Sequence, residues 1–203
     1  MRMRASRAPP EPTTMTHTHP THRRSDPGAH LHTIGALHTD DDDTRLDAAV
    51  AADWEAAIER FRATALDAPR FTEALASLVG TAPDRVRVTP VRDSDRISVH
   101  IDEALVGQWV SDAALIADVA ASTVLAVRDP QWDDLPVATR GHLLSTLRVY
   151  TPSCPRCAAP VELVVHAPVC SCEGPSAYRF DCAAADCGVT LYRIDKPTAD
   201  AFI

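Results

Sequence analysis

The sequence predicts an α+β protein: a small helix, β-hairpin and helix domain, then a compact C-terminal module of three strands, with a disordered tail at the N-terminus. Three observations lead to this prediction. Apolar residues recur with a helical period in four segments, two short segments alternate as β-strands do, and all six cysteines lie between Cys154 and Cys187. We divide the chain into a tail (1–43), an α+β domain (44–150) and a cysteine module (151–203).

The N-terminal tail is rich in Pro, Thr and His and has few large apolar residues, as in the stretch APPEPTTMTHTHPTHRRSD. Such a segment buries too little apolar surface to offset the entropy cost of ordering, so we expect it to be disordered. Its histidines stand at irregular spacing, and we interpret them as solvated side chains rather than as a metal site. Met3 and Met15 leave open where translation starts.

The first helix is predicted after the aspartate run at 40–43. Negative charge at this point favours the N-terminal end of a helix dipole, and Thr44 is the predicted N-cap. The apolar face recurs every three or four residues. Its members are Leu46, Val50, Trp54, Ile58, Phe61 and Ala65.

A second helix is predicted to follow Pro69 and to end at Gly80. Next, residues 85–91 and 96–102 both alternate apolar and polar side chains. The segment RDSD at 92–95 between them has the composition of a turn. These residues therefore predict a β-hairpin.

Two more helices are predicted before the cysteines. The first follows Ser111 as N-cap, and its apolar sequence indicates a largely buried helix. The second has Asp134 as a candidate cap and Pro136 in its first turn. Neither helix presents the Arg, Lys, Asn and Gln row that would contact base edges in DNA.

No catalytic pattern stands out in the chain. It has no G-x-S-x-G, no phosphate-binding glycine loop and no H-E-x-x-H, and it contains only seven glycines. The pairs Asp93 with Asp95, and Asp133 with Asp134, lie on predicted turns, where we expect solvated carboxylates. We therefore expect a protein that is not an enzyme.

The cysteine module has the order CPRC (154–157), a strand (161–169), the turn EGPS (173–176), a strand (177–181), CAAADCG (182–188) and a closing strand (189–194). This segment resembles a zinc ribbon. The resemblance implies a structural Zn²⁺ bound by Cys154, Cys157, Cys182 and Cys187. The two-residue spacer lets the first pair of thiolates turn toward one point, and Gly188 permits a tight conformation after the last ligand.

The module departs from the ribbon pattern in two ways. Four residues, not two, separate Cys182 from Cys187, so Cys182 is the least certain ligand. The additional pair Cys170 and Cys172 is an alternative metal or redox site. Pro160 follows CPRC too closely for the helix that a thioredoxin-type pair needs, and the absence of a signal peptide favours metal over disulfides.

The chain carries a net charge of −8, and Lys196 is its only lysine. This composition resembles that of proteins from salt-loving archaea, with actinobacteria as the other candidate source. We expect a cytoplasmic protein with no membrane span. Its expected partner is another protein, and the sequence does not indicate the oligomeric state. We therefore expect the protein to be a non-enzymatic zinc-binding protein that acts in protein interaction or regulation. The alternatives are a nucleic-acid-associated factor, which the acidic charge disfavours, and a thiol redox protein using Cys170 and Cys172.

Overall fold

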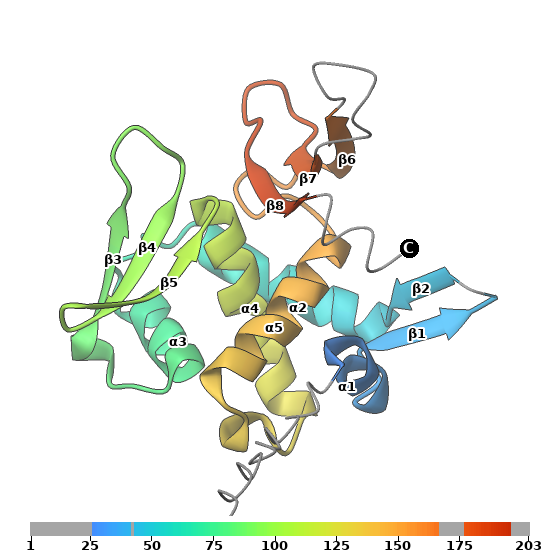
Figure 1. Ribbon diagram of the computed structural model, residues 1–203, viewed down its shortest axis with the longest axis horizontal. Helices are drawn as coiled ribbons and strands as arrows, with labels where there is room; N and C mark the ends of the chain where they lie inside the picture. The colour runs from blue at the N-terminus through green and yellow to red at the C-terminus, as the bar shows by residue number, and fades with distance from the viewer. Residues whose placement is uncertain (1–25, 42, 167–176, 196–203) are drawn as a thin grey trace, which may run out of the picture.

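The computed structural model describes residues 26–41, 43–166 and 177–195. In this part of the chain, α-helices combine with three small antiparallel sheets (Figure 1). The helices are α1 (Pro27–Thr33), α2 (Ala48–Arg62), α3 (Pro69–Val79), α4 (Asp112–Arg128) and α5 (Val137–Leu147). The strands are β1 (Leu37–Asp40), β2 (Asp43–Leu46), β3 (Val86–Pro90), β4 (Ile97–Ile101), β5 (Ala104–Trp109), β6 (Val161–His166), β7 (Ala177–Cys182) and β8 (Thr190–Asp195). Three short 3-10 turns are η1 (Pro83–Arg85), η2 (Trp132–Asp134) and η3 (Arg148–Tyr150). The α+β class is thereby confirmed.

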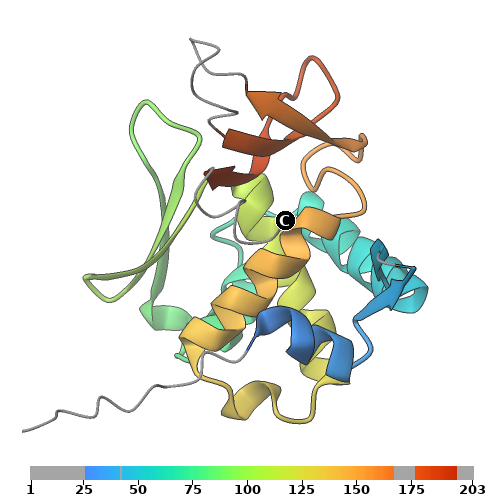
Figure 2. The same cartoon turned by 45° about the vertical axis from the view of Figure 1, so that its right-hand side comes forward.

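Helix α4 lies at the centre of the molecule, and α2, α3 and α5 pack against it (Figures 1 and 2). Every residue from 113 to 122 is buried, as expected for a helix that is apolar on nearly all sides. Ser111 caps the helix, because its Oγ accepts a hydrogen bond from the amide of Ala114 at 3.1 Å. The indole Nε1 of Trp54 in α2 donates to the carbonyl of Ala117 at 2.9 Å. The predicted start and burial of this helix are confirmed.

Helices α3 and α5 differ in how well their ends were predicted. Helix α3 begins at Pro69 and ends before Gly80, whose φ of 70° is the left-handed conformation that glycine adopts without strain. The predicted cap at Asp134 is wrong, since α5 begins only after Pro136. A residue that precedes proline is held in extended conformation, and Leu135 has φ −69° and ψ 136°, which separates η2 from α5.

The predicted hairpin is present as β3 and β4, and β5 extends it to three strands. The sequence analysis missed β5, because its residues do not alternate regularly and Gly107 interrupts them. A β-bulge between Val99 and His100 shifts the β4–β5 register at this point. A Cβ at Gly107 would lie 2.7 Å from the ring of Trp109, so glycine makes room for that ring.

The predicted disorder of residues 1–43 is wrong for residues 26–41 and 43, which form α1 and the hairpin β1–β2; residues 1–25 lie outside the described part. Helix α1 is anchored by two contacts with the body of the protein. Leu31 is fully buried, and Nε2 of His30 lies 2.8 Å from Oδ2 of the buried Asp129 at the end of α4. Pattern reasoning missed this helix because a single buried leucine has no periodicity.

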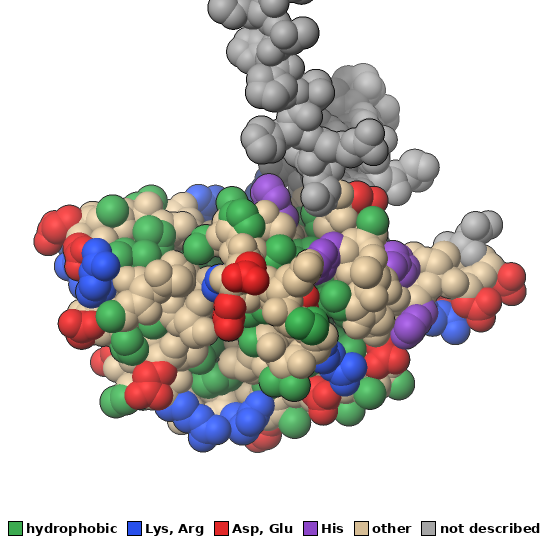
Figure 3. Space-filling model, turned by 90° about the horizontal axis from the view of Figure 1, so that it is seen from below, with side chains coloured by type: hydrophobic (Ala, Val, Ile, Leu, Met, Phe, Trp, Pro, Cys, Tyr) green, Lys and Arg blue, Asp and Glu red, His purple; other side chains and the backbone are tan. Residues whose placement is uncertain are grey.

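The aspartate run was also misassigned. Asp40, Asp41 and Asp43 are exposed at the tip of the β1–β2 hairpin, where Figure 3 shows acidic side chains at the end of a projection. Helix α2 starts later than predicted, at Ala48, and its N-cap is Asp47 instead of Thr44. The carboxylate of Asp47 accepts hydrogen bonds from the amides of Ala49 and Val50, each at 3.0 Å.

A buried ion pair joins four segments of the fold. Asp118, in the middle of α4, accepts hydrogen bonds from Nε and Nη2 of Arg148 at 2.9 and 2.5 Å. The indole Nε1 of Trp109 in β5 donates to the same carboxylate at 2.7 Å. The guanidinium of Arg148 also lies 5.4 Å from the ring centroid of Tyr192 in β8. This group of residues therefore connects the central helix to the β3–β5 sheet and to the cysteine module.

We predict that Arg148→Ala destabilises the protein by about 3–5 kcal/mol, because the substitution leaves the carboxylate of Asp118 buried without a charge partner. Chemical denaturation followed by far-UV circular dichroism measures this change. The control is Arg85→Ala, which removes an exposed ion pair with Asp102 and should change the denaturation midpoint little. An equal loss of stability in both variants would contradict the central role of the buried pair.

We predict a pH-dependent effect of Asp47→Ala on thermal stability. The hydrogen bond from the amide of Val50 lowers the pKa of Asp47 below its usual value. The stabilisation is therefore present above the pKa of the unfolded state, about 3.9, and is lost as the pH falls through the lower folded-state pKa. The difference in Tm between wild type and Asp47→Ala should be full at pH 7 and should shrink below about pH 4. A Tm difference that stays constant from pH 7 to below about pH 4 would contradict this prediction.

Candidate metal centre

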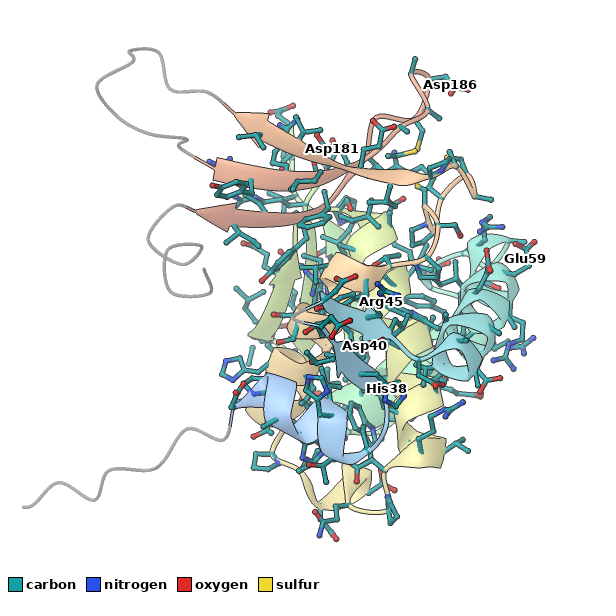
Figure 4. All side chains as sticks on the ribbon, turned by 90° about the vertical axis from the view of Figure 1, so that its right-hand side faces the viewer. His38, Asp40, Arg45, Glu59, Asp181 and Asp186 are labelled. Carbon is teal, nitrogen blue, oxygen red and sulfur yellow. The ribbon has the colours of Figure 1, made fainter. Side chains whose placement is uncertain are left out.

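The structure brings together the four cysteines that the sequence analysis ranked first. The sulfur atoms of Cys154, Cys157, Cys182 and Cys187 all lie within 4.8 Å of one another. The Sγ atoms of Cys154 and Cys187 are 3.9 Å apart, and those of Cys157 and Cys182 are 3.3 Å apart. Figure 4 shows the sulfur atoms gathered beneath the loop that carries Asp186.

Two loops hold the cysteines, and backbone hydrogen bonds close each loop. In the first loop, 154–159, the amide of Cys154 donates to the carbonyl of Ala159 and the amide of Ala158 donates to the carbonyl of Cys154, both at 2.8 Å. In the second loop, 182–188, the amides of Cys187 and Gly188 donate to the carbonyl of Ala184 at 3.0 and 2.9 Å. The left-handed φ of 52° at Gly188 agrees with the tight turn predicted there.

The two loops are joined by the sheet. Cys182 is the last residue of β7, and its strand partner is Val161, the first residue of β6. The amide of Ala183 donates to the carbonyl of Pro160 at 2.9 Å, which holds the second loop against the first. Although four residues separate Cys182 from Cys187, Cys182 belongs to the cluster. Its position at the end of strand β7 places its side chain beside the other three cysteines.

The thiols of the cluster differ in their surroundings. Burial raises the pKa of Cys154 and of Cys182 above the usual value for cysteine. Cys157 is exposed, and the hydrogen bond from the amide of Ala159 lowers its pKa. Buried thiols favour the neutral form in the absence of a cation, so a positive ion at the centre of the cluster would stabilise all four thiolates.

The geometry fits a tetrahedral thiolate site. A zinc–sulfur distance of about 2.3 Å gives sulfur–sulfur separations of roughly 3.8 Å in a regular tetrahedron. The separations of 3.3 and 3.9 Å within the two closely placed pairs lie on either side of this value, and all four sulfur atoms lie within 4.8 Å of one another. Four thiolates without oxygen donors are the ligand set that thiophilic metals prefer. The cluster can therefore hold a metal ion.

The four-cysteine cluster packs against the N-terminal end of α4. Ala113 of α4 packs in one buried cluster with Cys154, Cys182, Val189 and Leu191. Arg156, between the first two cysteines, forms an ion pair of 2.5 Å with Asp112. These contacts make the cysteine module continuous with the helical part of the protein.

Two more hydrogen bonds anchor the module to the helices. The hydroxyl of Ser111 donates to the carbonyl of Thr190 in β8 at 2.6 Å, and Nε of Arg62 in α2 donates to the carbonyl of Pro155 at 3.2 Å. The sequence analysis did not select Arg62, Asp112 or Arg156. Of these three residues, only Arg156 could have been identified from the sequence, because it lies inside the motif CPRC.

The alternative pair, Cys170 and Cys172, lies outside the described residues, so its role stays a prediction.

Within the described part, no helix is both long enough and apolar enough to cross a bilayer. In the described part of the cysteine module, Arg179 forms an ion pair of 2.5 Å with Asp181.

These features define an α+β protein with a four-cysteine site able to hold a metal ion. Residues 26–149 match the central domain of a family of unknown function, DUF8054, and the chain belongs to this family. The matched region begins at the first described residue and ends just before the first cysteine, so the four-cysteine cluster lies beyond it. No curated protein and no solved structure matches the chain.

We predict that Cys154→Ser and Cys182→Ser each reduce the metal content of the purified protein severalfold, because three thiolates and a hydroxyl bind zinc less tightly than four thiolates. Elemental analysis of metal per chain measures the effect. The matched control replaces Cys170 and Cys172 together with serine and should retain the metal. Loss of metal in the control alone would reverse the assignment of the ligands.

Proposed function

We propose that this chain is a zinc-binding protein in which a structural four-thiolate centre attaches the cysteine module to a helical domain. The cluster of four sulfur atoms within 4.8 Å is the observation that carries the proposal. A zinc ion with four cysteine ligands has no open coordination position, so the site has a structural and not a catalytic role. The protein is then a non-enzymatic unit for interaction or regulation.

The small size of the cysteine module supports a structural role for the metal. The described part of the cysteine module buries few apolar side chains, chiefly Val189 and Leu191. A module of this size needs additional stabilisation, and metal binding supplies it in many small domains. Reduced thiols are also required, which agrees with the expectation of a cytoplasmic protein.

The charge distribution favours a protein partner over a nucleic acid. The chain has a net charge of −8, which repels phosphate. In the cysteine module, Arg156 is paired with Asp112 and Arg179 with Asp181, so both charges are neutralised within the fold.

A thiol redox role is the second candidate, and one observation favours it. Cys157 is exposed, and its Sγ lies 3.3 Å from that of Cys182. Added hydrogen peroxide would take two electrons from these two zinc-bound thiolates as their disulfide forms, and with two protons from solvent it would be reduced to two molecules of water. Zinc would be released at the same time, because two of its four ligands would be lost.

We predict that Co²⁺ replaces the native metal with one ion per chain and gives the intense thiolate charge-transfer and tetrahedral d–d absorption of a four-sulfur site. Removal of the metal with a chelator should lower the Tm, and addition of zinc should restore it. A spectrum typical of five or six ligands, or one sensitive to added small anions, would indicate an open site and contradict the structural role. A protein isolated without metal and with disulfides would favour the redox candidate.

A further inference from the structure

A cleft of about 430 Å³ lies beside the metal centre and is lined by four segments that are distant in the sequence. One wall is the β3–β4 hairpin, which rises beside the cysteine module in Figure 2. The other walls are the loop between α2 and α3, the first turn of α4, and Arg156 of the first cysteine loop. The volume is within the range of clefts that bind small ligands, about 300–1,000 Å³, so it has room for one long side chain.

The floor of the cleft is apolar. Leu66, Val88 and Pro90 contribute to it, together with Ile97, which is only 7% exposed. The first two side chains are half-buried and remain in contact with solvent through the cleft. An aliphatic chain placed on this floor would remove apolar surface from water, which is favourable.

The rim of the cleft is acidic. Asp112 is already neutralised by Arg156 at 2.5 Å. Asp67 and Asp95 also line the cleft, are exposed, and form no salt bridge with any other residue in the described part of the chain. The cleft therefore carries two carboxylates in excess, which selects for a positively charged ligand.

We propose that this cleft binds an arginine or lysine side chain of a partner polypeptide. The aliphatic stem lies on the floor formed by Leu66, Val88 and Ile97, and the cationic head lies beside the carboxylates of Asp67 and Asp95. The inference rests on the proposed function as an interaction unit, and it names the chemistry of the partner.

The metal centre contributes one wall of this site. Arg156 stands between Cys154 and Cys157, so the metal that closes this loop also positions the guanidinium against Asp112. Arg156 and Asp95 both line the cleft, so the position of the guanidinium also affects the charge inside it. Loss of the metal should release Arg156 from Asp112 and so change the affinity of the cleft for a cation.

The test is a titration of the zinc-loaded full chain with the blocked tripeptide acetyl-Ala-Arg-Ala-amide, followed by amide chemical shifts in NMR spectra. The amides of Leu66, Val88 and Ile97 should shift in a saturable manner. The matched peptide with citrulline in place of arginine has the same shape without the charge, and it should bind about fivefold more weakly. The variant Asp67→Asn with Asp95→Asn should lose affinity for the arginine peptide by a similar factor.

The control variant is Asp133→Asn with Asp134→Asn, which changes the net charge equally at the exposed turn η2. It should bind as wild type does. Shifts that do not saturate, an equal loss in both variants, or equal binding of the citrulline peptide would overturn the cleft site.

The zinc content of each sample separates the two proposals. A chain with one zinc that fails to bind the peptide overturns the cleft alone. A chain without zinc that still binds the peptide overturns the structural metal centre and leaves the cleft intact. Unchanged peptide affinity after chelation would show that Arg156 does not depend on the metal.

Discussion

The arrangement of this protein depends on one buried carboxylate. Asp118 lies in the middle of an otherwise apolar helix, and such a charge is costly to bury unless it is fully paired. Arg148 and Trp109 supply the donors, and Arg148 extends the contact to the ring of Tyr192. Since these residues belong to η3, β5 and β8, their pairing determines where the β3–β5 sheet and the cysteine module lie against α4.

The cysteine loops and this ion pair hold the cysteine module against the helices at two points. The ion pair contacts the middle of β8, and the cysteine loops rest on the first turn of α4 through Asp112 and Ser111. The first cysteine loop also contributes to the acidic cleft, because its residue Arg156 forms one wall. A metal that orders this loop would thus shape a surface outside the coordination sphere, a link between metal binding and partner recognition.

Much of the fold was predictable because local signals were strong. The periodic faces of α2 to α5, the stop at Gly80 and the cap at Ser111 follow from residue spacing and backbone preference. The signals were weak where tertiary contacts stabilise a short element. Helix α1 depends on Leu31 and on the contact of His30 with Asp129, a residue 99 positions away. No pattern within seven residues could reveal such a contact.

The sequence by itself determined the α+β class and the four cysteines of the candidate centre, because ligand spacing and hydrophobic period are local properties of the chain. Only the tertiary structure decided what surrounds that centre. The pairing of Arg156 with Asp112, the support from Arg62 and the excess carboxylates of the cleft join residues from separate elements. Their proximity results from packing around α4, and packing depends on side-chain contacts between distant segments that spacing along the chain does not encode.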